Sequence, residues 1–142
     1  MSIPKIKFKK LSPDAKIPVR AHETDAGFDF YCTEIVVKEK YLAYHTGIAV
    51  EMPSRFVGLA FPRSSVIKID MMLKNSVGVI DPSYRGEIIF MYNKLGDEIF
   101  RVGDRIGQLV FLNLPKVDAV EELGELSKTK RGTGGFGSSG IK

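Results

Sequence analysis

Cysteine, histidine and tryptophan are scarce in this sequence of 142 residues, which holds one cysteine, two histidines and no tryptophan. A lone Cys32 excludes a disulfide within the chain and any metal site built from several thiolates. We expect Cys32 to be a small strand residue without a redox role. No spacing pairs His22 or His45 with a second metal-ligating residue, so we expect both on the surface or in loops.

Long apolar runs are also missing. No run approaches the ~20 residues of a membrane-spanning helix, and the first residues lack the apolar stretch of a signal peptide. We therefore expect a cytoplasmic protein with no membrane partner. What is present is the composition of a globular domain, with 44% hydrophobic and 27% charged residues. A chain of this size predicts one domain, with a folded surface of ~7,300 Å².

Positive charge is concentrated at the beginning of the chain. The net charge is +4, and residues 1–20 hold six basic residues against one acidic residue. Lys5, Lys7 and Lys9 alternate with apolar residues, as expected for a strand with one solvated face. A nucleic-acid interface needs basic residues from several elements, usually with interleaved aromatics. We therefore predict a solvated edge strand and no nucleic-acid partner.

Short apolar runs are broken by glycine, proline and charged turns at intervals of roughly 8–12 residues, a pattern typical of an all-β sandwich or barrel. No long segment keeps a helical period. The best helix candidate is one or two turns at residues 64–68, with Ser64 as N-cap. The sequence therefore predicts an all-β domain with one short helix. The candidate strands are residues 5–9, 28–31, 35–38, 41–44, 47–52, 56–61, 70–74, 77–80, 86–92, 98–101, 105–112 and 116–120.

The final residues differ from the rest, because almost no apolar side chain follows Ser127 and five glycines fall within the last eleven residues. Such a segment forms no regular strand or helix of its own. It nevertheless carries Arg131, Phe136 and several hydroxyls, which are the groups needed to close over a phosphorylated ring compound. Its glycines fit a dinucleotide-binding fingerprint only by spacing, since no strand–helix unit surrounds them. We expect a β domain over residues 1–126 and a flexible lid over residues 127–142.

Four further segments combine polar residues with turn residues in otherwise apolar surroundings. Each alone has an ordinary explanation, since Ser64 can cap a helix and Asp81 begins a common turn sequence. The third segment reads as a hairpin whose corner presents Asp81 and Tyr84. The four segments are residues 25–30, 62–65, 75–86 and 103–108.

Together with the tail, these segments resemble the five sequence motifs of the trimeric dUTPase family, in the family's order. Residues 26–30 are similar to the first motif, 62–65 to the second, 78–86 to the third, 103–108 to the fourth and 131–140 to the fifth. The resemblance extends from about residue 20 to the C-terminus, which is nearly the whole chain.

The resemblance implies a jelly-roll-like β fold and a homotrimer whose active sites are shared between subunits. The implied reaction hydrolyses dUTP to dUMP and pyrophosphate, which limits uracil in DNA and supplies dUMP for thymidylate synthesis. The implied cofactor is Mg²⁺, held mainly by substrate phosphates and water. Departures from the family pattern are small: Ser65, Gly107 and Ser139 stand where glycine, alanine and threonine are usual.

The resemblance also implies a role for each matching residue. Asp81 matches the carboxylate that activates the attacking water. Phosphate contacts match Arg63, Ser64, Ser65, Gln108, Arg131, Gly137 and Ser138. Uracil and deoxyribose contacts match Asn75, Gly78, Val79, Ile80, Tyr84 and Phe136, with Tyr84 against the sugar and Phe136 stacked on the base. Structural or outer-shell positions match Asp29, Asp104 and Arg105, and we expect Asp29 to support the site rather than to lie in the outer shell of the metal.

Two alternatives compete with dUTP hydrolysis. A dCTP deaminase shares the implied fold, but its chemistry needs a carboxylate at the base end of the pocket, and residues 75–80 offer none. A non-catalytic trimeric module would bind a nucleotide without cleaving it. That interpretation gives no reason for an acidic turn and an arginine–aromatic tail to occur in one chain. We therefore expect dUTP hydrolysis and place the deaminase second.

Overall fold

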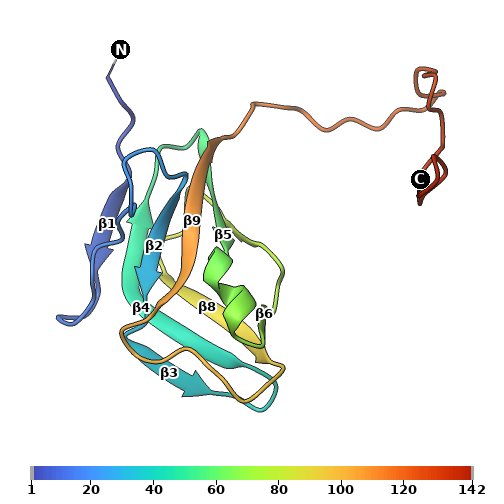
Figure 1. Ribbon diagram of the computed structural model, residues 1–142. Helices are drawn as coiled ribbons and strands as arrows, with labels where there is room; N and C mark the ends of the chain where they lie inside the picture. Colours follow the sequence, from blue (N-terminus) through green and yellow to red (C-terminus); the bar gives the residue numbers. More distant parts are fainter. Residues whose placement is uncertain (1, 142) are drawn as a thin grey trace.

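Two antiparallel β-sheets face each other across one core, and the C-terminal segment extends away from them (Figure 1). The structure, a computed structural model, describes residues 2–141. One sheet joins β1 (Lys7–Lys10), β4 (Leu42–Glu51), β8 (Glu87–Lys94) and β6 (Met71–Leu73) in that order, and β3 (Glu34–Val37) also pairs with β4. The other sheet joins β2 (Gly27–Tyr31), β9 (Arg105–Asn113), β5 (Phe56–Phe61) and β7 (Gly78–Ile80). Together with the short helix η1 (Ser64–Lys68), these sheets confirm the expected all-β, jelly-roll-like fold.

Aromatic residues fill the space between the sheets. Tyr44, Tyr92 and Phe100 meet at steep angles, with ring centroids 5.3–5.8 Å apart. Both tyrosines are fully buried, and their hydroxyls donate to backbone carbonyls, Tyr44 to Phe100 at 3.3 Å and Tyr92 to Ile106 at 2.6 Å. The core therefore buries large rings without leaving their polar ends unpaired.

Strand β1 lies at the edge of its sheet, as the alternation of its lysines predicts. Phe8 packs against Phe28 and Phe30, with ring centroids 5.6 and 6.0 Å away. Lys7 points to solvent and pairs with Glu51 at 2.9 Å. The prediction of a solvated edge strand is confirmed.

Most predicted strands are present within two residues of their expected bounds, but residues 41–44 and 47–52 are not two strands. They form the single strand β4, whose pairing with β8 shifts between His45 and Ala49. Gly47 lies within this register shift and adopts the left-handed conformation, with φ +65°. The sequence pattern breaks at this point because the strand bulges there, and the strand does not end.

Two predicted strands are absent from the described part of the chain. Residues 98–101 form no strand, because Phe100 turns into the core and its carbonyl accepts the Tyr44 hydroxyl. Residues 116–120 also form no strand. Val117 and Val120 are exposed, and no described strand of the same chain pairs with this segment.

The predicted hairpin over residues 75–86 is wrong as well. Strand β7 pairs with β5, whereas β8 pairs with β4 and β6 in the opposite sheet. The turn after β7 therefore carries the chain from one sheet to the other. Pro82 lacks a backbone N–H, and the connection is too long for a tight two-residue hairpin turn.

Three smaller expectations also differ from the structure. Helix η1 is a 3₁₀ helix with Arg63 at its N-cap position and no capping side-chain bond, so Ser64 is not its cap. His22 lies in an exposed turn as predicted, but His45 is half-buried on β4, where the bulge turns its ring toward Glu87. Cys32 is buried one residue past β2, and burial raises the pKa of its thiol to about 11. Among residues 2–141, no helix is long and apolar enough to cross a membrane.

Candidate functional site

A surface depression of about 260 Å³ lies beside the neighbouring strands β2, β9 and β5. Gln108 on β9 stands opposite Asp29 on β2 and opposite Phe61 at the end of β5. The strand order therefore gathers three sequence segments that are far apart along the chain. The depression is lined by Ala21, Asp25, Ala26, Gly27, Asp29, Arg63, Ser64 and Gln108.

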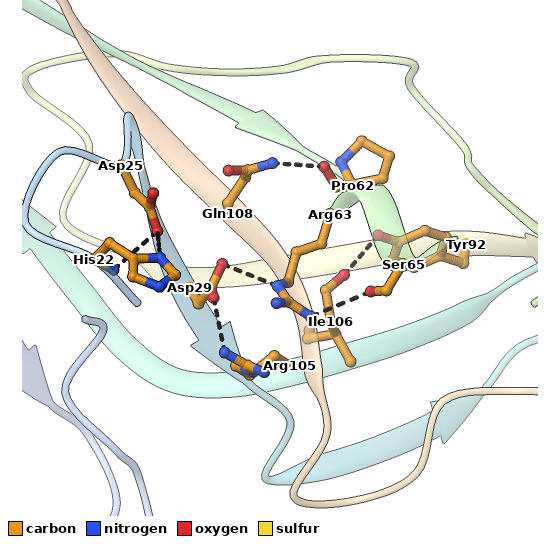
Figure 2. Close-up of polar contacts among 10 residues, drawn as sticks. All are labelled: His22, Asp25, Asp29, Pro62, Arg63, Ser65, Tyr92, Arg105, Ile106 and Gln108. Carbon is orange, nitrogen blue, oxygen red and sulfur yellow. Dashed lines mark hydrogen bonds and ion pairs between the residues drawn. The ribbon is translucent and has the colours of Figure 1, made fainter. Parts of the chain in front are cut away.

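Asp29 is the charged centre of this arrangement, and its side chain is only 10% exposed. One carboxylate oxygen lies 3.0 Å from Nε of Arg63, and the other lies 3.4 Å from Nη1 of Arg105 (Figure 2). Both oxygens thus accept from arginine, which compensates for burial of the charge. The contacts hold the Arg63 guanidinium at the edge of the depression, where it can meet an anion.

Gln108 supplies a second oriented polar group. Its side-chain amide donates to the Pro62 carbonyl at 2.9 Å, beside Arg63 (Figure 2). The same side chain lies over Gly27, where an added Cβ would collide with the amide group. A glycine at position 27 therefore lets the Gln108 amide keep this position.

Ser65 and Asp104 lie on the other side of the arginine pair. Ser65 accepts a hydrogen bond from Nη1 of Arg63 at 3.2 Å, and it lines a neighbouring depression of about 250 Å³ with Asp104 and Arg105. Asp104 closes the turn before β9, where its carboxylate accepts from the Arg101 backbone N–H at 2.8 Å. Of the predicted phosphate-contacting residues outside the tail, the first depression thus brings together Arg63, Ser64 and Gln108 but not Ser65.

Asp81 and Tyr84 lie in a different depression, of about 240 Å³, formed by β7, β8 and the turn between them. Val79 and Ile80 line the same depression. Asp81 is exposed, and its carbonyl accepts the Tyr84 N–H at 3.0 Å. The carboxylate is therefore presented at the surface by a short turn.

The turn between β6 and β7 holds Asn75 next to Gly78. Ser76 between them adopts the left-handed conformation, with φ 60°. An added Cβ at Gly78 would lie 3.0 Å from Cβ of Ala60 and 3.5 Å from Nδ2 of Asn75. The turn therefore keeps the Asn75 amide and the backbone of Gly78 together.

The tail extends away from both sheets, and so from the strands that border the two depressions (Figure 1). Its ring residue Phe136 is fully exposed and, like Gly137, has a positive φ, of 51° and 83° respectively. Nε of Arg131 donates to the Gly134 carbonyl at 2.8 Å, and Ser138 N–H donates to the Gly135 carbonyl at 3.0 Å. The segment is thus a series of tight turns held by its own hydrogen bonds.

Asp25 begins the first of the four polar segments, but the sequence analysis gave it no role in the site. It lines the first depression, and its carboxylate accepts from the His22 backbone N–H at 2.9 Å. This hydrogen bond, with the nearby His22 ring and Arg20, lowers the pKa of Asp25 below its usual range. The spacing of an Asp three residues after a turn residue is the only sequence signal for this contact.

Within residues 2–141, no three side chains among histidine, cysteine, aspartate and glutamate come together as a metal site. The predicted residues instead form three separate groups in one chain: the arginine-lined depression, the Asp81 depression and the tail. A single chain therefore presents a depression lined by Arg63, Ser64 and Gln108, an exposed carboxylate beside a second depression, and a separate segment that carries Phe136.

Comparison with known proteins shows which family the whole chain is similar to. The family model described as dUTPase matches residues 13–140. A deoxyuridine 5'-triphosphate nucleotidohydrolase of Clostridium tetani is 40% identical over 140 residues, covering 95% of this chain and 96% of the relative. The enzyme of the same name from Hydrogenobaculum is 41% identical over 145 residues, covering 97% and 99%.

Solved structures agree in fold. A dUTPase of Staphylococcus bacteriophage 80alpha with dUPNHPP superposes with a TM-score of 0.83 at 28% identity, covering 96% of this chain and 99% of that one. A mutant dUTPase of phage phi11 of S. aureus, described with a structural Mg(II) ion, superposes with a TM-score of 0.67 at 28% identity, covering 84% and 98%.

Proposed function

The chain belongs to the dUTPase family, and from its geometry we propose which residues carry the hydrolysis of dUTP to dUMP and pyrophosphate. The observation that carries the proposal is the Asp29-held Arg63, which lies beside Ser64 and Gln108 in one depression. This group offers a cation, a hydroxyl and an amide to a phosphate chain, and the Asp29 carboxylate beside them is neutralised by two arginines.

Asp81 is the proposed general base. It takes a proton from a water molecule, whose oxygen attacks the α-phosphorus as the bond from that phosphorus to the bridging oxygen breaks. Pyrophosphate leaves, and dUMP remains. The exposed position of Asp81 beside Val79 and Ile80 supports this role, because a nucleoside bound along β7 brings its α-phosphate to the turn.

Charge grows on the phosphate oxygens during this step, so hydrogen-bond donors must be in place beforehand. We assign this role to Arg63, Ser64 and Gln108. Arg63 and Gln108 are already oriented by Asp29 and the Pro62 carbonyl, so their reorganisation is small. Ser65 acts by accepting a hydrogen bond from Arg63. Structural roles are assigned to Asp29, Asp104 and Arg105.

The nucleoside end is assigned to the β6–β7 turn and to strand β7. Asn75 and the backbone of Gly78, Val79 and Ile80 face the uracil edge, and the Tyr84 ring lies against the deoxyribose, where it excludes a 2′-hydroxyl. Phe136 stacks on the base when the tail closes, a contact of ~1–3 kcal/mol by analogy with other base–aromatic pairs. Arg131, Gly137 and Ser138 then reach the outer phosphates.

Completion of this site requires more than one chain, and we propose a homotrimer. The two depressions and the tail are separate in a single protomer, and Leu123 and Leu126 on the way to the tail are more than 80% exposed. The accessible surface of 10,689 Å² also exceeds the ~7,300 Å² of a compact chain of this mass. Packing of residues 114–126 on a neighbouring chain would bury these leucine side chains.

Mg²⁺ is the proposed cofactor. Both Asp29 oxygens are occupied by arginines, so the residues present fit a metal held by substrate phosphates and water rather than by a protein cage. Bound in this way, the metal would neutralise charge on the triphosphate.

The test is pyrophosphate release from dUTP measured beside dTTP, dCTP and UTP, with and without Mg²⁺. We expect release from dUTP in large excess over the other three. Ammonia release from dCTP would instead indicate a deaminase, and nucleotide binding without any product would indicate a non-catalytic module. A sedimentation measurement on the same sample reports the oligomer.

A further inference from the structure

Tyr84 does not stand free in its depression but is folded back onto the chain. Its hydroxyl donates to the backbone carbonyl of Glu87 at 2.9 Å. Its ring lies on Gly86, where an added Cβ would lie 2.5 Å from Cζ and 2.9 Å from Cε2 of the tyrosine. Gly86 is outside the positive-φ region, so the ring alone excludes a side chain there. The ring is thus fixed at its face by Gly86 and at its tip by Glu87.

Glu87, whose carbonyl accepts the Tyr84 hydroxyl, is itself bonded through its side chain to the neighbouring strand β4. Glu87 is the first residue of β8, and its side chain is 24% exposed. One carboxylate oxygen lies 2.9 Å from Nδ1 of His45, and the other accepts the Gly47 N–H at 2.7 Å. Both contacts reach β4 at its bulge, where four steps along β4 (45 to 49) match two along β8 (89 to 87). The carboxylate therefore spans the irregular part of the ladder.

The bulge cannot easily rearrange around this carboxylate. Gly47 has φ +65°, and an added Cβ there would lie 2.5 Å from Oγ of Ser12 and 2.9 Å from Cβ of Ala15. Its carbonyl accepts the Leu11 N–H at 2.7 Å, and the Thr46 hydroxyl donates to the Ile88 carbonyl at 2.6 Å. Backbone groups that the bulge removes from the ladder are thus bonded elsewhere. The position of Glu87 relative to β4 is therefore well defined.

We propose that Glu87 is a positioning residue for sugar recognition, acting through Tyr84. Its carboxylate fixes the start of β8 to the β4 bulge, its carbonyl holds the Tyr84 hydroxyl, and Gly86 provides the flat surface on which the ring rests. Discrimination between deoxyribose and ribose then depends on a carboxylate that does not touch the sugar. The inference rests on the proposed role of Tyr84, and it adds the reason why the ring keeps one position.

The main test compares Glu87→Ala with Glu87→Gln by measuring kcat/KM for dUTP and for UTP. The alanine removes both contacts to β4, and we expect the preference for dUTP to fall about tenfold, since small displacements of a positioning group cost this much or more. The glutamine can still accept from Gly47 and meet the His45 ring, so it should keep most of the preference. Glu39→Ala, an exposed carboxylate in the turn between β3 and β4, is the matched control.

Equal losses for dUTP and UTP in Glu87→Ala, with the preference unchanged, would show a merely structural carboxylate and overturn the proposal. Should that variant fail to fold, Gly86→Ala decides, because it displaces the ring directly. Gly96→Ala is its control, since an added Cβ there meets the side chain of Asp70. A Gly86→Ala enzyme with unchanged preference would likewise overturn the proposal.

A spectroscopic measurement separates this inference from the proposed function. The five tyrosines can be labelled as 3-fluorotyrosine, and the Tyr84 ¹⁹F resonance is identified by its loss in Tyr84→Phe. We expect that resonance to move in Glu87→Ala and to stay in place in Glu39→Ala. If the wild-type protein hydrolyses no dUTP, the proposed function fails. In that case the ¹⁹F measurement alone tests the positioning role of Glu87, and a Tyr84 resonance that does not move in Glu87→Ala refutes that role.

Discussion

Nε of Arg63 lies 3.0 Å from a carboxylate oxygen of Asp29, although the two residues lie in segments far apart along the chain. The second oxygen of Asp29 is 3.4 Å from Arg105, whose side chain is 41% exposed, against 22% for Arg63. The Arg63–Asp29 ion pair is shorter and less exposed than the Arg105–Asp29 pair, so it is the stronger of the two. A buried anion of this kind orients one cation toward a ligand, and the second cation offsets the cost of burying it.

Asp29→Asn should therefore impair catalysis more than folding. The asparagine keeps the shape of the side chain but removes the charge that orients Arg63, and charge-assisted hydrogen bonds contribute about 1.5–3 kcal/mol. We expect kcat/KM for dUTP to fall roughly 10- to 100-fold. Arg63→Gln should reproduce this loss, whereas Arg105→Gln should have a smaller effect. Steady-state kinetics test the order, with the exposed Asp97→Asn as control, and full activity in Asp29→Asn would contradict it.

Asp81→Asn tests the general base. Asp81 is exposed in the turn after β7, so its replacement should leave the melting temperature nearly unchanged. Loss of a general base costs about 10²- to 10⁴-fold in rate. We expect kcat to fall by this factor while the affinity for a non-hydrolysable imido analogue of dUTP, measured by calorimetry, changes little. Wild-type turnover in the variant would remove Asp81 from the mechanism.

Deletion of residues 131–142 tests the lid. In the part of the chain that the structure describes, the hydrogen bonds of this segment run within itself and to Thr129, so the β domain should fold and assemble without it. We expect most turnover to be lost while sedimentation is unchanged. Phe136→Ala isolates the stacking contact and should weaken binding by about 1–3 kcal/mol, roughly 5- to 150-fold. Near-normal rates after deletion would refute the lid.

The sequence predicted the strands well, because alternating β-branched and aromatic residues are a local signal that each strand of a two-sheet sandwich must carry. The sequence-based prediction was wrong where the structure depends on which strands pair with each other. The hairpin over residues 75–86 failed because the choice of β5 for β7 and of β4 for β8 is made by the whole fold. The strand expected over residues 116–120 is absent because nothing within the described chain pairs with it.

The site shows the same division between local and long-range information. Motif order identified Arg63, Ser64 and Gln108, which do meet in one depression. No local pattern revealed that Asp29 would bind two arginines, nor that His45 would leave the surface to contact Glu87, since both contacts join segments far apart in sequence.

Alkaline pH should destabilise the protein through its buried acids. Burial raises the pKa of Tyr44 to about 12 and also raises the pKa of Tyr92. The folded state therefore keeps these protons after the unfolded chain has lost them. The contribution of these two tyrosines to the free energy of unfolding should be complete below pH ~10 and fall as pH rises toward 12, by at most about 1.4 kcal/mol per pH unit for each group. Cys32 should add a further decline in the free energy of unfolding, which begins near pH ~9 and ends at about 11.

Urea unfolding from pH 8 to 11 measures how steeply the free energy of unfolding falls with pH. Cys32→Ala should remove the early part, and Tyr44→Phe should flatten the later part while costing about 1 kcal/mol for the lost bond to Phe100. A free energy of unfolding that stays constant to pH 11 in the wild type would contradict the prediction.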